Sequence, residues 1–313
     1  MVAGKVRSID PTALAGSLLP ECLTEYLVVD GFSKPSVAVT GATGYIGGEV
    51  ARHLAAAGLP QRLLARTPSR APKLPGAEAV ECSYEDREAS HAALSGIATL
   101  FMVSASESAE RLEQHRTFID SAARARVRHV VYTSFVGARP DATFTLARDH
   151  YFTEEHIIKS GMTYTFLRDN FYIDFLSGLA GDDGVIRGPA GDGRVAAVAR
   201  KDVALVGATV MKAPEKHTNR TYELTGAEAL SLAEIAGMLS EHTGRAVRYH
   251  DETIAEAYRS RQRWNAPSWQ LDAWVSTYAA IAAGELATVT TDVATITGHP
   301  PTSFVKYLES VEP

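Results

Sequence analysis

Six short apolar runs alternate with amphipathic segments between residues 37 and 175, and this alternation limits the possible folds more than any other feature of the chain. The runs are Val37–Thr40, Arg62–Ala65, Ala79–Cys82, Thr99–Val103, His129–Thr133 and Thr163–Leu167. Between the fourth and fifth runs, one helical face is formed at spacings of three and four by Leu112, His115, Ile119 and Ala122. Strands that alternate with helices in this way predict a doubly wound, parallel α/β sheet.

The composition argues against several classes of protein. With 31 Lys and Arg against 37 Asp and Glu, the net charge of −6 disfavours nucleic acid as a partner. Cys22 and Cys82 are too few for a disulfide framework, and the ten histidines show no recognised ligand spacing, so no metal is expected. No apolar run reaches the roughly 18 residues of a membrane span. Because Asp10, Glu21 and Glu25 interrupt any leader, we expect a cytoplasmic location.

The turn after the first run is rich in glycine and leads into a helical segment. It consists of Gly41-Ala42-Thr43-Gly44-Tyr45-Ile46-Gly47. Between a strand and a helix, such glycines form a tight turn, let the backbone approach a pyrophosphate and let helix and strand pack closely. The anion binds N–H groups at the positive end of the helix. We therefore expect a Rossmann-type dinucleotide site, with an ordinary strand–helix turn as the alternative. Its predicted binding residues are Gly41, Thr43, Gly44, Tyr45, Ile46 and Gly47.

The end of the second run indicates which dinucleotide binds. An NAD site normally has a carboxylate about 20 residues after the glycine turn, which binds the ribose 2′-hydroxyl. No acidic residue lies between Glu49 and Glu78, whereas Arg66 stands at the end of the second predicted strand. A guanidinium there can form paired hydrogen bonds with a 2′-phosphate. We therefore predict NADPH or NADP as the cofactor, selected by Arg66; a solvated basic face is the competing interpretation.

The regularity of the pattern changes twice, which divides the chain into three parts. Residues 1–35 lack sustained periodicity and are interpreted as an N-terminal extension, either an added leader or an arm that docks on a neighbour. Residues 36–175 are the predicted dinucleotide-binding domain, to which a segment near 195–225 returns. Residues 176–313 begin with glycine-rich loops and continue with helical patterns. We expect them to form a smaller, mostly helical portion that covers the substrate.

Glycines and one capping pattern mark the predicted helix ends. Gly58, Gly96 and Gly161 stand where three helices should stop. Ser231 and Glu234 form an S-x-x-E capping box at the start of a later helix.

Three segments resemble a known family. Residues 41–47 resemble the glycine motif of the atypical short-chain dehydrogenase/reductases. Residues 150–154 (HYFTE) and 164–172 (YTFLRDNFY) are similar to the NmrA-like branch, in particular to its bacterial NADPH quinone oxidoreductases and triphenylmethane reductases. The resemblance extends from about residue 37 to residue 308. It implies a Rossmann-type sheet and an NADPH-dependent oxidoreductase.

One element of the wider family is missing. Short-chain dehydrogenases that act on alcohols and ketones use a Tyr followed four residues later by a Lys, but here Tyr151 is followed by Glu155. His150 and Glu154 share that spacing and one helical face, and they match the H-x-x-T-E segment of the quinone and dye reductases. The resemblance therefore implies a pocket role for His150, which with Tyr172 is a candidate catalytic residue. A surface contact without a chemical role is the alternative.

Further candidates stand at the ends of predicted strands and among the aromatic residues. For the cofactor they are Ser104, Ser106, Thr133 and Asn170. The resembling family has an Asn directly after the Arg of the last segment, whereas this chain has Asp169 there, so which side chain faces the nicotinamide is open. The substrate-binding candidates are Phe135, Phe171 and Trp269. Trp269 belongs to a cluster of three tryptophans that forms either a lid or a packing contact.

Two functions from different classes fit these observations. The first is an NADPH-dependent reductase that transfers hydride to a small-molecule acceptor, a quinone or a similar flat, conjugated compound. Such a transfer creates little oxyanion that needs immediate protonation, so the missing Tyr–Lys pair does not prevent it. The second is a catalytically silent NADP(H)-binding redox sensor of the NmrA type. A homo-oligomer is compatible with either.

Overall fold

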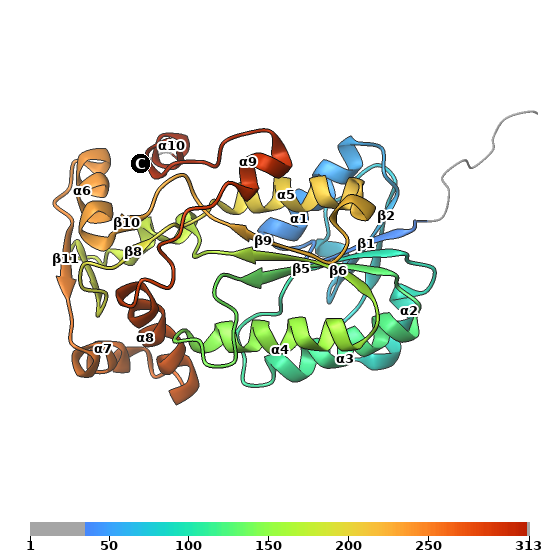
Figure 1. The fold of residues 1–313 in the computed structure, drawn as a ribbon, viewed down its shortest axis with the longest axis horizontal. Coiled ribbons are helices and arrows are strands. Elements are labelled where there is room, and N and C mark those ends of the chain that lie inside the picture. Colours follow the sequence, from blue (N-terminus) through green and yellow to red (C-terminus); the bar gives the residue numbers. More distant parts are fainter. Residues whose placement is uncertain (1–34, 312–313) are drawn as a thin grey trace, which may run out of the picture. The chain divides into compact units, whose positions relative to one another are not determined.

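The fold is built on a sheet of seven parallel strands (Figure 1). The computed structural model describes residues 35–311, so all but the last residue of the predicted extension lies outside the described residues. The strands are β1 (Val37–Thr40), β2 (Gln61–Ala65), β3 (Ala77–Glu81), β4 (Thr99–Met102), β5 (His129–Phe135), β6 (Thr163–Asp169) and β9 (Arg220–Leu224). Their order is β3-β2-β1-β4-β5-β6-β9, and every neighbouring pair is parallel. The predicted doubly wound α/β sheet is confirmed, with its change of direction between β1 and β4.

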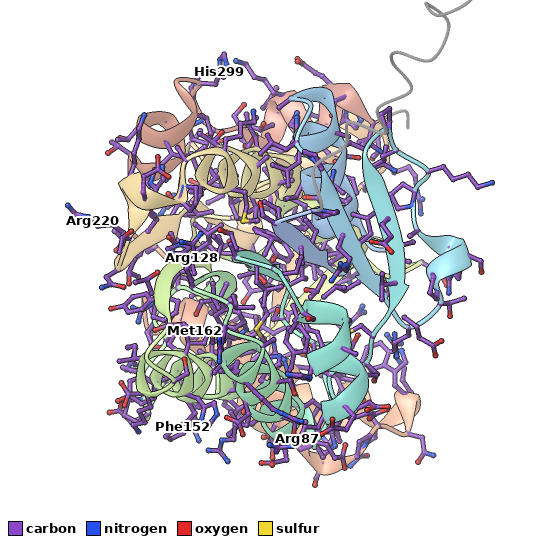
Figure 2. All side chains as sticks on the ribbon, turned by 90° about the vertical axis from the view of Figure 1, so that its right-hand side faces the viewer. Arg87, Arg128, Phe152, Met162, Arg220 and His299 are labelled. Carbon is purple, nitrogen blue, oxygen red and sulfur yellow. The ribbon has the colours of Figure 1, made fainter. Side chains whose placement is uncertain are left out.

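Helices cover both faces of the sheet, because its central strands β1, β4 and β5 are buried on both sides. One face carries α1 (Tyr45–Ala56), α5 (Arg200–Lys212) and α9 (Asp292–Thr297), and the other carries α2 (Arg87–Leu94), α3 (Arg111–Arg124) and α4 (Thr145–Lys159) (Figure 1). Within β4, Phe101 packs in the core of the first face, whereas Leu100 and Met102 pack in the core of the second. Phe152 of α4 and Arg87 of α2 lie on the outer side of the second helical layer (Figure 2).

The predicted helix ends are confirmed. Gly58, Gly96 and Gly161 follow α1, α2 and α4 with φ angles of 72°, 80° and 81°. Ser231 and Glu234 form a reciprocal capping box at the start of α6 (Leu232–Thr243).

The residues after β6 add two small strand pairs and further helices. β7 (Val185–Gly188) pairs in parallel with β11 (Arg248–Asp251), and β8 (Arg194–Val195) pairs antiparallel with β10 (Leu230–Ser231). The helices are α6, α7 (Ile254–Arg261), α8 (Ser268–Ala282) and α10 (Phe304–Ser310). Short 3₁₀ turns lie at Pro68–Arg70, Ile173–Phe175, Ser177–Leu179, Pro214–His217 and Gln262–Trp264. Leu232, Ile281 and Phe304 belong to the core that these elements share.

The chain returns to the main sheet after residue 175. Residues 200–224 supply α5 and β9, within the segment near 195–225 that was expected to return. Val293 of α9 packs in the core beside β1. The chain therefore returns to the main sheet a second time, which the sequence pattern did not predict. The described residues belong to one compact unit, so the division at residue 175 stays a prediction.

Three further observations concern the composition. Cys82 is a buried free thiol, and Cys22 lies outside the described residues. No helix within residues 35–311 is long and apolar enough to cross a membrane. No group of three or more His, Cys, Asp or Glu in the same range could hold a metal ion.

Replacing Gly207 by Ala tests how closely α5 packs on the sheet. A Cβ atom at Gly207 would lie 2.6 Å from Cε2 of the fully buried Phe101 ring. Overpacking of a core usually costs about 1–3 kcal/mol. We therefore expect urea denaturation to show that Gly207→Ala lowers the free energy of unfolding by about this amount.

Gly237→Ala on α6 is the matched control. No atom lies within 4 Å of the Cβ position at Gly237, so the free energy of unfolding should stay unchanged or rise by roughly 0.5–1 kcal/mol. Equal effects of the two substitutions would show that α5 is not tightly packed.

Candidate functional site

The glycine turn leaves the start of α1 open to an anion. No side chain caps the helix at Gly44, and its first turn contains no acidic residue. The N–H of Gly44 donates to the carbonyl of Gly41 at 2.9 Å, which closes the turn. A Cβ atom at Gly47 would lie 2.4 Å from the carbonyl oxygen of Thr40, so glycine alone lets α1 lie this close to β1. Free N–H groups at such a helix start are a phosphate site.

A cavity of about 300 Å³ opens beside this turn, at the carboxyl ends of β1 to β4. Five of the predicted cofactor residues line it: Gly41, Thr43, Arg66, Ser104 and Ser106. The other predicted turn residues, Gly44, Tyr45, Ile46 and Gly47, form the entry to α1. Arg66 is exposed, and no carboxylate among residues 35–311 forms an ion pair with it. The structure therefore brings the glycine turn and the predicted selecting residue to one cavity.

Tyr84 lies in the same cavity, although the sequence analysis does not single it out. Its hydroxyl donates to the carbonyl of Val103 at 2.6 Å and lies 2.7 Å from Oγ1 of Thr40. Burial raises the pKa of Tyr84, so the hydroxyl is neutral and links the ends of β1 and β4. In the sequence, Tyr84 is one aromatic residue shortly after the third apolar run. This pattern is too common to identify a site residue.

A buried polar network holds the backbone of Ser104 and Ala105. The N–H of Ser104 donates to Oγ1 of Thr133 at 2.9 Å, and that of Ala105 donates to Nε2 of His115 at 2.8 Å. Nε of Arg111 donates to the carbonyl of Ala105 at 3.0 Å. Thr133 is 2% exposed and contacts the cavity wall through this backbone bond. The network thus fixes one wall of the cavity from behind.

His150 belongs to this network and does not line the cavity. Its Nε2 lies 3.0 Å from Nη2 of Arg111, and its Nδ1 lies 2.9 Å from the hydroxyl of Tyr132. Because a guanidinium can only donate, Nε2 is the acceptor and Nδ1 carries the proton. Burial and the adjacent Arg111 lower the pKa of His150, so its ring is neutral at neutral pH.

The rest of the H-x-x-T-E segment also makes internal contacts. Oγ1 of Thr153 lies 2.8 Å from Nδ1 of His115. Glu154 accepts from Nε and Nη2 of Arg168 at 2.9 and 2.7 Å and from Oγ of Ser134 at 2.5 Å. These bonds tie α4 to α3, β5 and β6. The segment therefore positions the carboxyl edge of the sheet.

Tyr172 is paired with the carboxyl group that ends β6. Its hydroxyl donates to Oδ2 of Asp169 at 2.8 Å. Asp169 is 1% exposed, and its Oδ1 has no hydrogen-bond partner among the described residues. Burial raises the pKa of the Asp169 carboxyl well above its usual range, and burial together with this carboxyl raises the pKa of Tyr172. The Asp169 carboxyl and the Tyr172 hydroxyl therefore both favour their protonated, neutral forms.

The Asn170 side chain is turned into the protein. It is fully buried, its Nδ2 donates to the carbonyl of Leu286 at 3.0 Å, and its Oδ1 accepts from the N–H of Phe171 at 2.7 Å. The structure thus separates Asn170 from the predicted cofactor residues that line the cavity of about 300 Å³.

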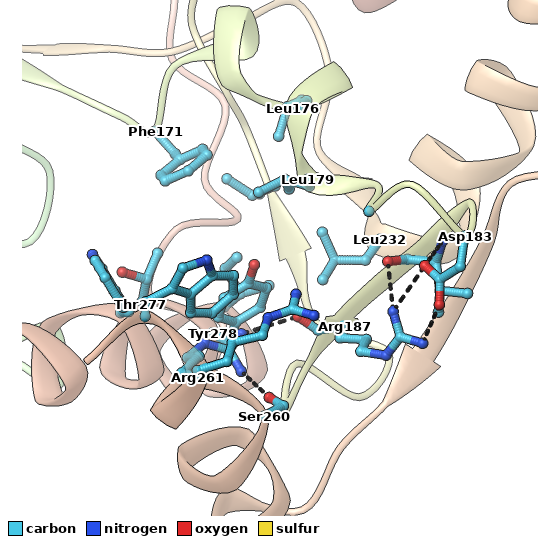
Figure 3. A pocket seen from close by; sticks show the side chains of 18 of the residues that line it. Phe171, Leu176, Leu179, Asp183, Arg187, Leu232, Ser260, Arg261, Thr277 and Tyr278 are labelled. Carbon is cyan, nitrogen blue, oxygen red and sulfur yellow. Dashed lines mark hydrogen bonds and ion pairs between the residues drawn. The ribbon is translucent and has the colours of Figure 1, made fainter. Parts of the chain in front are cut away.

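A second cavity, of about 1140 Å³, lies among the residues after β6 (Figure 3). The predicted Phe171 lines it. Trp269 does not; Trp264 and Trp274, with ring centroids 5.7 Å apart, line it instead. Phe135 lines neither cavity and packs with its ring centroid 6.1 Å from that of His150. Of the three predicted substrate residues, the structure brings one to the large cavity.

Comparison with known proteins gives the family. The model of the NmrA-like family matches residues 33–262. The chain belongs to the NmrA-like family. This NmrA-like chain is 31% identical to quinone oxidoreductase 2 of Escherichia coli (strain K12), over 86% of the chain and 96% of that protein. It is 30% identical to the NAD(P)H azoreductase of Xenophilus azovorans, over 88% of the chain and 97% of that protein.

Two solved structures resemble the NmrA-like chain over almost their whole length. The E. coli NADPH-dependent quinone oxidoreductase QOR2, complexed with NADPH, has a TM-score of 0.81 at 29% identity and covers 88% of this chain and 99% of its own. The Citrobacter sp. triphenylmethane reductase, complexed with NADP(H), has a TM-score of 0.79 at 30% identity with the same two coverages. The family resemblance found in the sequence is confirmed.

The buried His150 ring predicts that the protein loses stability in acid. Because the pKa of His150 is lowered in the folded state, the unfolded chain takes up a proton below its usual pKa of about 6.5 and the folded chain does not. The free energy of unfolding should therefore fall as the pH drops below about 6.5. Urea denaturation between pH 7 and pH 5 should show a pH slope that is smaller in His150→Gln by up to about 1.4 kcal/mol per pH unit.

The control is His299→Gln, which removes an exposed histidine. Its pH slope should match that of the unmodified chain. A slope unchanged in His150→Gln would mean that the ring takes up its proton over the same pH range in the folded and the unfolded chain.

Proposed function

We propose that this NmrA-like chain is an NADPH-dependent reductase that transfers hydride to a quinone or a similar flat, conjugated acceptor. The chain is an NAD(P)H-dependent oxidoreductase: its relatives are named quinone oxidoreductase and azoreductase, and structural neighbours hold NADPH or NADP(H). The predicted enzyme class and cofactor are thereby confirmed, whereas the acceptor is the proposed part. The observation that carries the proposal is the cavity that joins the uncapped start of α1 to Arg66.

The residues of the small cavity fit the adenosine and phosphate end of NADPH. The N–H groups at the start of α1 would bind the pyrophosphate, and the guanidinium of Arg66 would bind the 2′-phosphate. Glu85 is the one acidic side chain among the residues that line this cavity, and Nε2 of Gln114 donates to it at 3.5 Å. The preference for NADPH therefore requires that the attraction between Arg66 and the 2′-phosphate exceed the repulsion from the Glu85 carboxylate.

The chain's own groups would act by positioning. NADPH supplies the hydride when it is bound, and the protein holds donor and acceptor in contact and excludes water. Both ring nitrogens of His150 are engaged, so we assign it the role of a positioning residue, which acts through Arg111 on the cavity wall. Phe171 follows β6 at the carboxyl edge, where it can hold the flat face of an acceptor.

Arg66→Glu tests the cofactor assignment. The substitution removes the charge-assisted hydrogen bonds to the 2′-phosphate and adds repulsion. We expect kcat/KM for NADPH to fall roughly ten- to a hundredfold, while kcat/KM for NADH stays unchanged or rises. Arg70→Glu is the charge-matched control, because Arg70 is exposed nearby and does not line the cavity. An unchanged preference for NADPH in Arg66→Glu would place the 2′-phosphate elsewhere.

Acceptor-dependent oxidation of NADPH tests the reaction itself. The purified chain is assayed with NADPH and with NADH, each against a panel of quinones and cationic dyes. We expect NADPH to be consumed only when an acceptor is present, at a rate that depends on the acceptor. Tight binding of NADPH without turnover on any acceptor would refute the reductase and favour the redox sensor.

A further inference from the structure

The large cavity has more room than a flat acceptor ring requires. Its volume of about 1140 Å³ exceeds the roughly 300–1,000 Å³ that is typical of small-ligand sites. One or two fused rings against Phe171 would leave most of this space filled with water beside apolar walls. Burial of further apolar surface there would be favourable.

The lining of the cavity is aromatic in one part and aliphatic in another. Its aromatic residues are Phe171, Trp264, Trp274 and Tyr278, and its aliphatic residues are Leu176, Leu179, Val185, Val195, Leu232 and Ile281. In Figure 3, Phe171, Leu176 and Leu179 follow one another along one wall, and Thr277 and Tyr278 lie on the opposite wall. An aliphatic path therefore begins beside Phe171 and continues along Leu176 and Leu179.

The wall opposite the leucines is rigid. A Cβ atom at Gly188 would lie 2.2 Å from the Tyr278 ring, so this ring lies directly on the Gly188 backbone. The guanidinium carbon of Arg261 is 4.9 Å from the ring centroid, and Nη1 of Arg261 is paired with Glu252 at 2.9 Å in the interior. A wall fixed in this way loses little conformational entropy when a ligand binds.

Of the five charged residues that line the cavity, Asp183, Arg187 and Arg261 form ion pairs, whereas Asp182 and Arg263 are exposed and form none with residues 35–311. At the end farthest from Phe171, Asp183 and Arg187 form an ion pair of 2.6 Å that is partly exposed (Figure 3). Arg261 is likewise paired with Glu252. The wall between Phe171 and this ion pair therefore suits an uncharged apolar group, and the polar end provides a mouth to solvent.

We propose that the acceptor carries an extended apolar substituent, such as an alkyl or prenyl chain, on its conjugated head. This inference rests on the proposed function. The head lies at Phe171, beside the carboxyl edge to which the nicotinamide must come, and the chain passes Leu179 and Leu232 toward the mouth at Asp183 and Arg187.

A series of 1,4-benzoquinones with alkyl chains of increasing length tests this proposal. At saturating NADPH, each added methylene should lower KM roughly two- to fourfold until the path is filled. We expect kcat to stay nearly constant, because the chain contacts ground state and transition state equally. Quenching of the fluorescence of Trp264 and Trp274 by the same quinones measures binding without turnover, since both rings line the cavity.

Two substitutions in the path separate specific binding from general hydrophobicity. Leu179→Glu places a carboxylate beside the chain, and Gly178→Phe fills the path from a position with no atom within 4 Å of its Cβ. Both should weaken the dependence of KM on chain length, so that the ratio of KM for methylbenzoquinone to KM for the longest quinone falls toward one. Ile158→Glu, at an exposed position on α4 outside both cavities, is the control and should keep the full dependence.

The outcomes distinguish the two proposals. A KM and a quenching affinity that do not vary with chain length in the unmodified chain would overturn the apolar substituent but leave the reductase intact. If KM depended on chain length in Leu179→Glu and Gly178→Phe as strongly as in the unmodified chain, the proposed apolar substituent would be overturned as well. NADPH oxidation that no quinone stimulates, methylbenzoquinone included, would refute the reductase, and the quenching series would still decide whether the cavity binds apolar chains.

Discussion

The close approach of α1 to β1 is the contact on which the functional half of the molecule depends. At Gly47 the helix lies so near the carbonyl of Thr40 that no side chain fits between them. This contact directs the free N–H groups of the helix start toward the carboxyl edge of the sheet, where β2 delivers Arg66. The proposed phosphate site and its proposed selecting charge therefore depend on one glycine and on the pairing of two adjacent strands, β1 and β2.

The H-x-x-T-E segment contacts other parts of the protein through every one of its three motif residues. His150, Thr153 and Glu154 each bond to a residue of another element, and through Arg111 and His115 the bonds reach the backbone of Ala105. Charged and polar groups in such a network are costly to bury unless every partner is present. The absence of a Tyr–Lys pair then agrees with a reaction in which the protein provides geometry and the cofactor provides the hydride.

The sequence was sufficient to predict the parts of the fold that local patterns determine. Six strands of the main sheet, the glycine turn and the helix ends at Gly58, Gly96 and Gly161 all lie where periodicity and glycine placed them. The pairs β7–β11 and β8–β10 were not predicted, because β8 and β10 have only two residues each and β11 contains no apolar run, so their distant partners specify them. Tyr84 and the orientation of Asn170 could not be predicted for the same reason: both depend on contacts with residues that are far away in the chain, Val103 and Leu286.

The two cavities are built from different stretches of the chain, and this separation bears on how new activities arise. Every residue that lines the cofactor cavity lies between Thr40 and Gln114, whereas every residue that lines the large cavity lies between Phe171 and Ile281. In the proposed reductase, mutations in the later stretch would therefore change acceptor preference while the residues of the small cavity stay the same. Such a division would let a lineage of these reductases acquire new oxidants by drift in one half of a gene, without first losing its source of electrons.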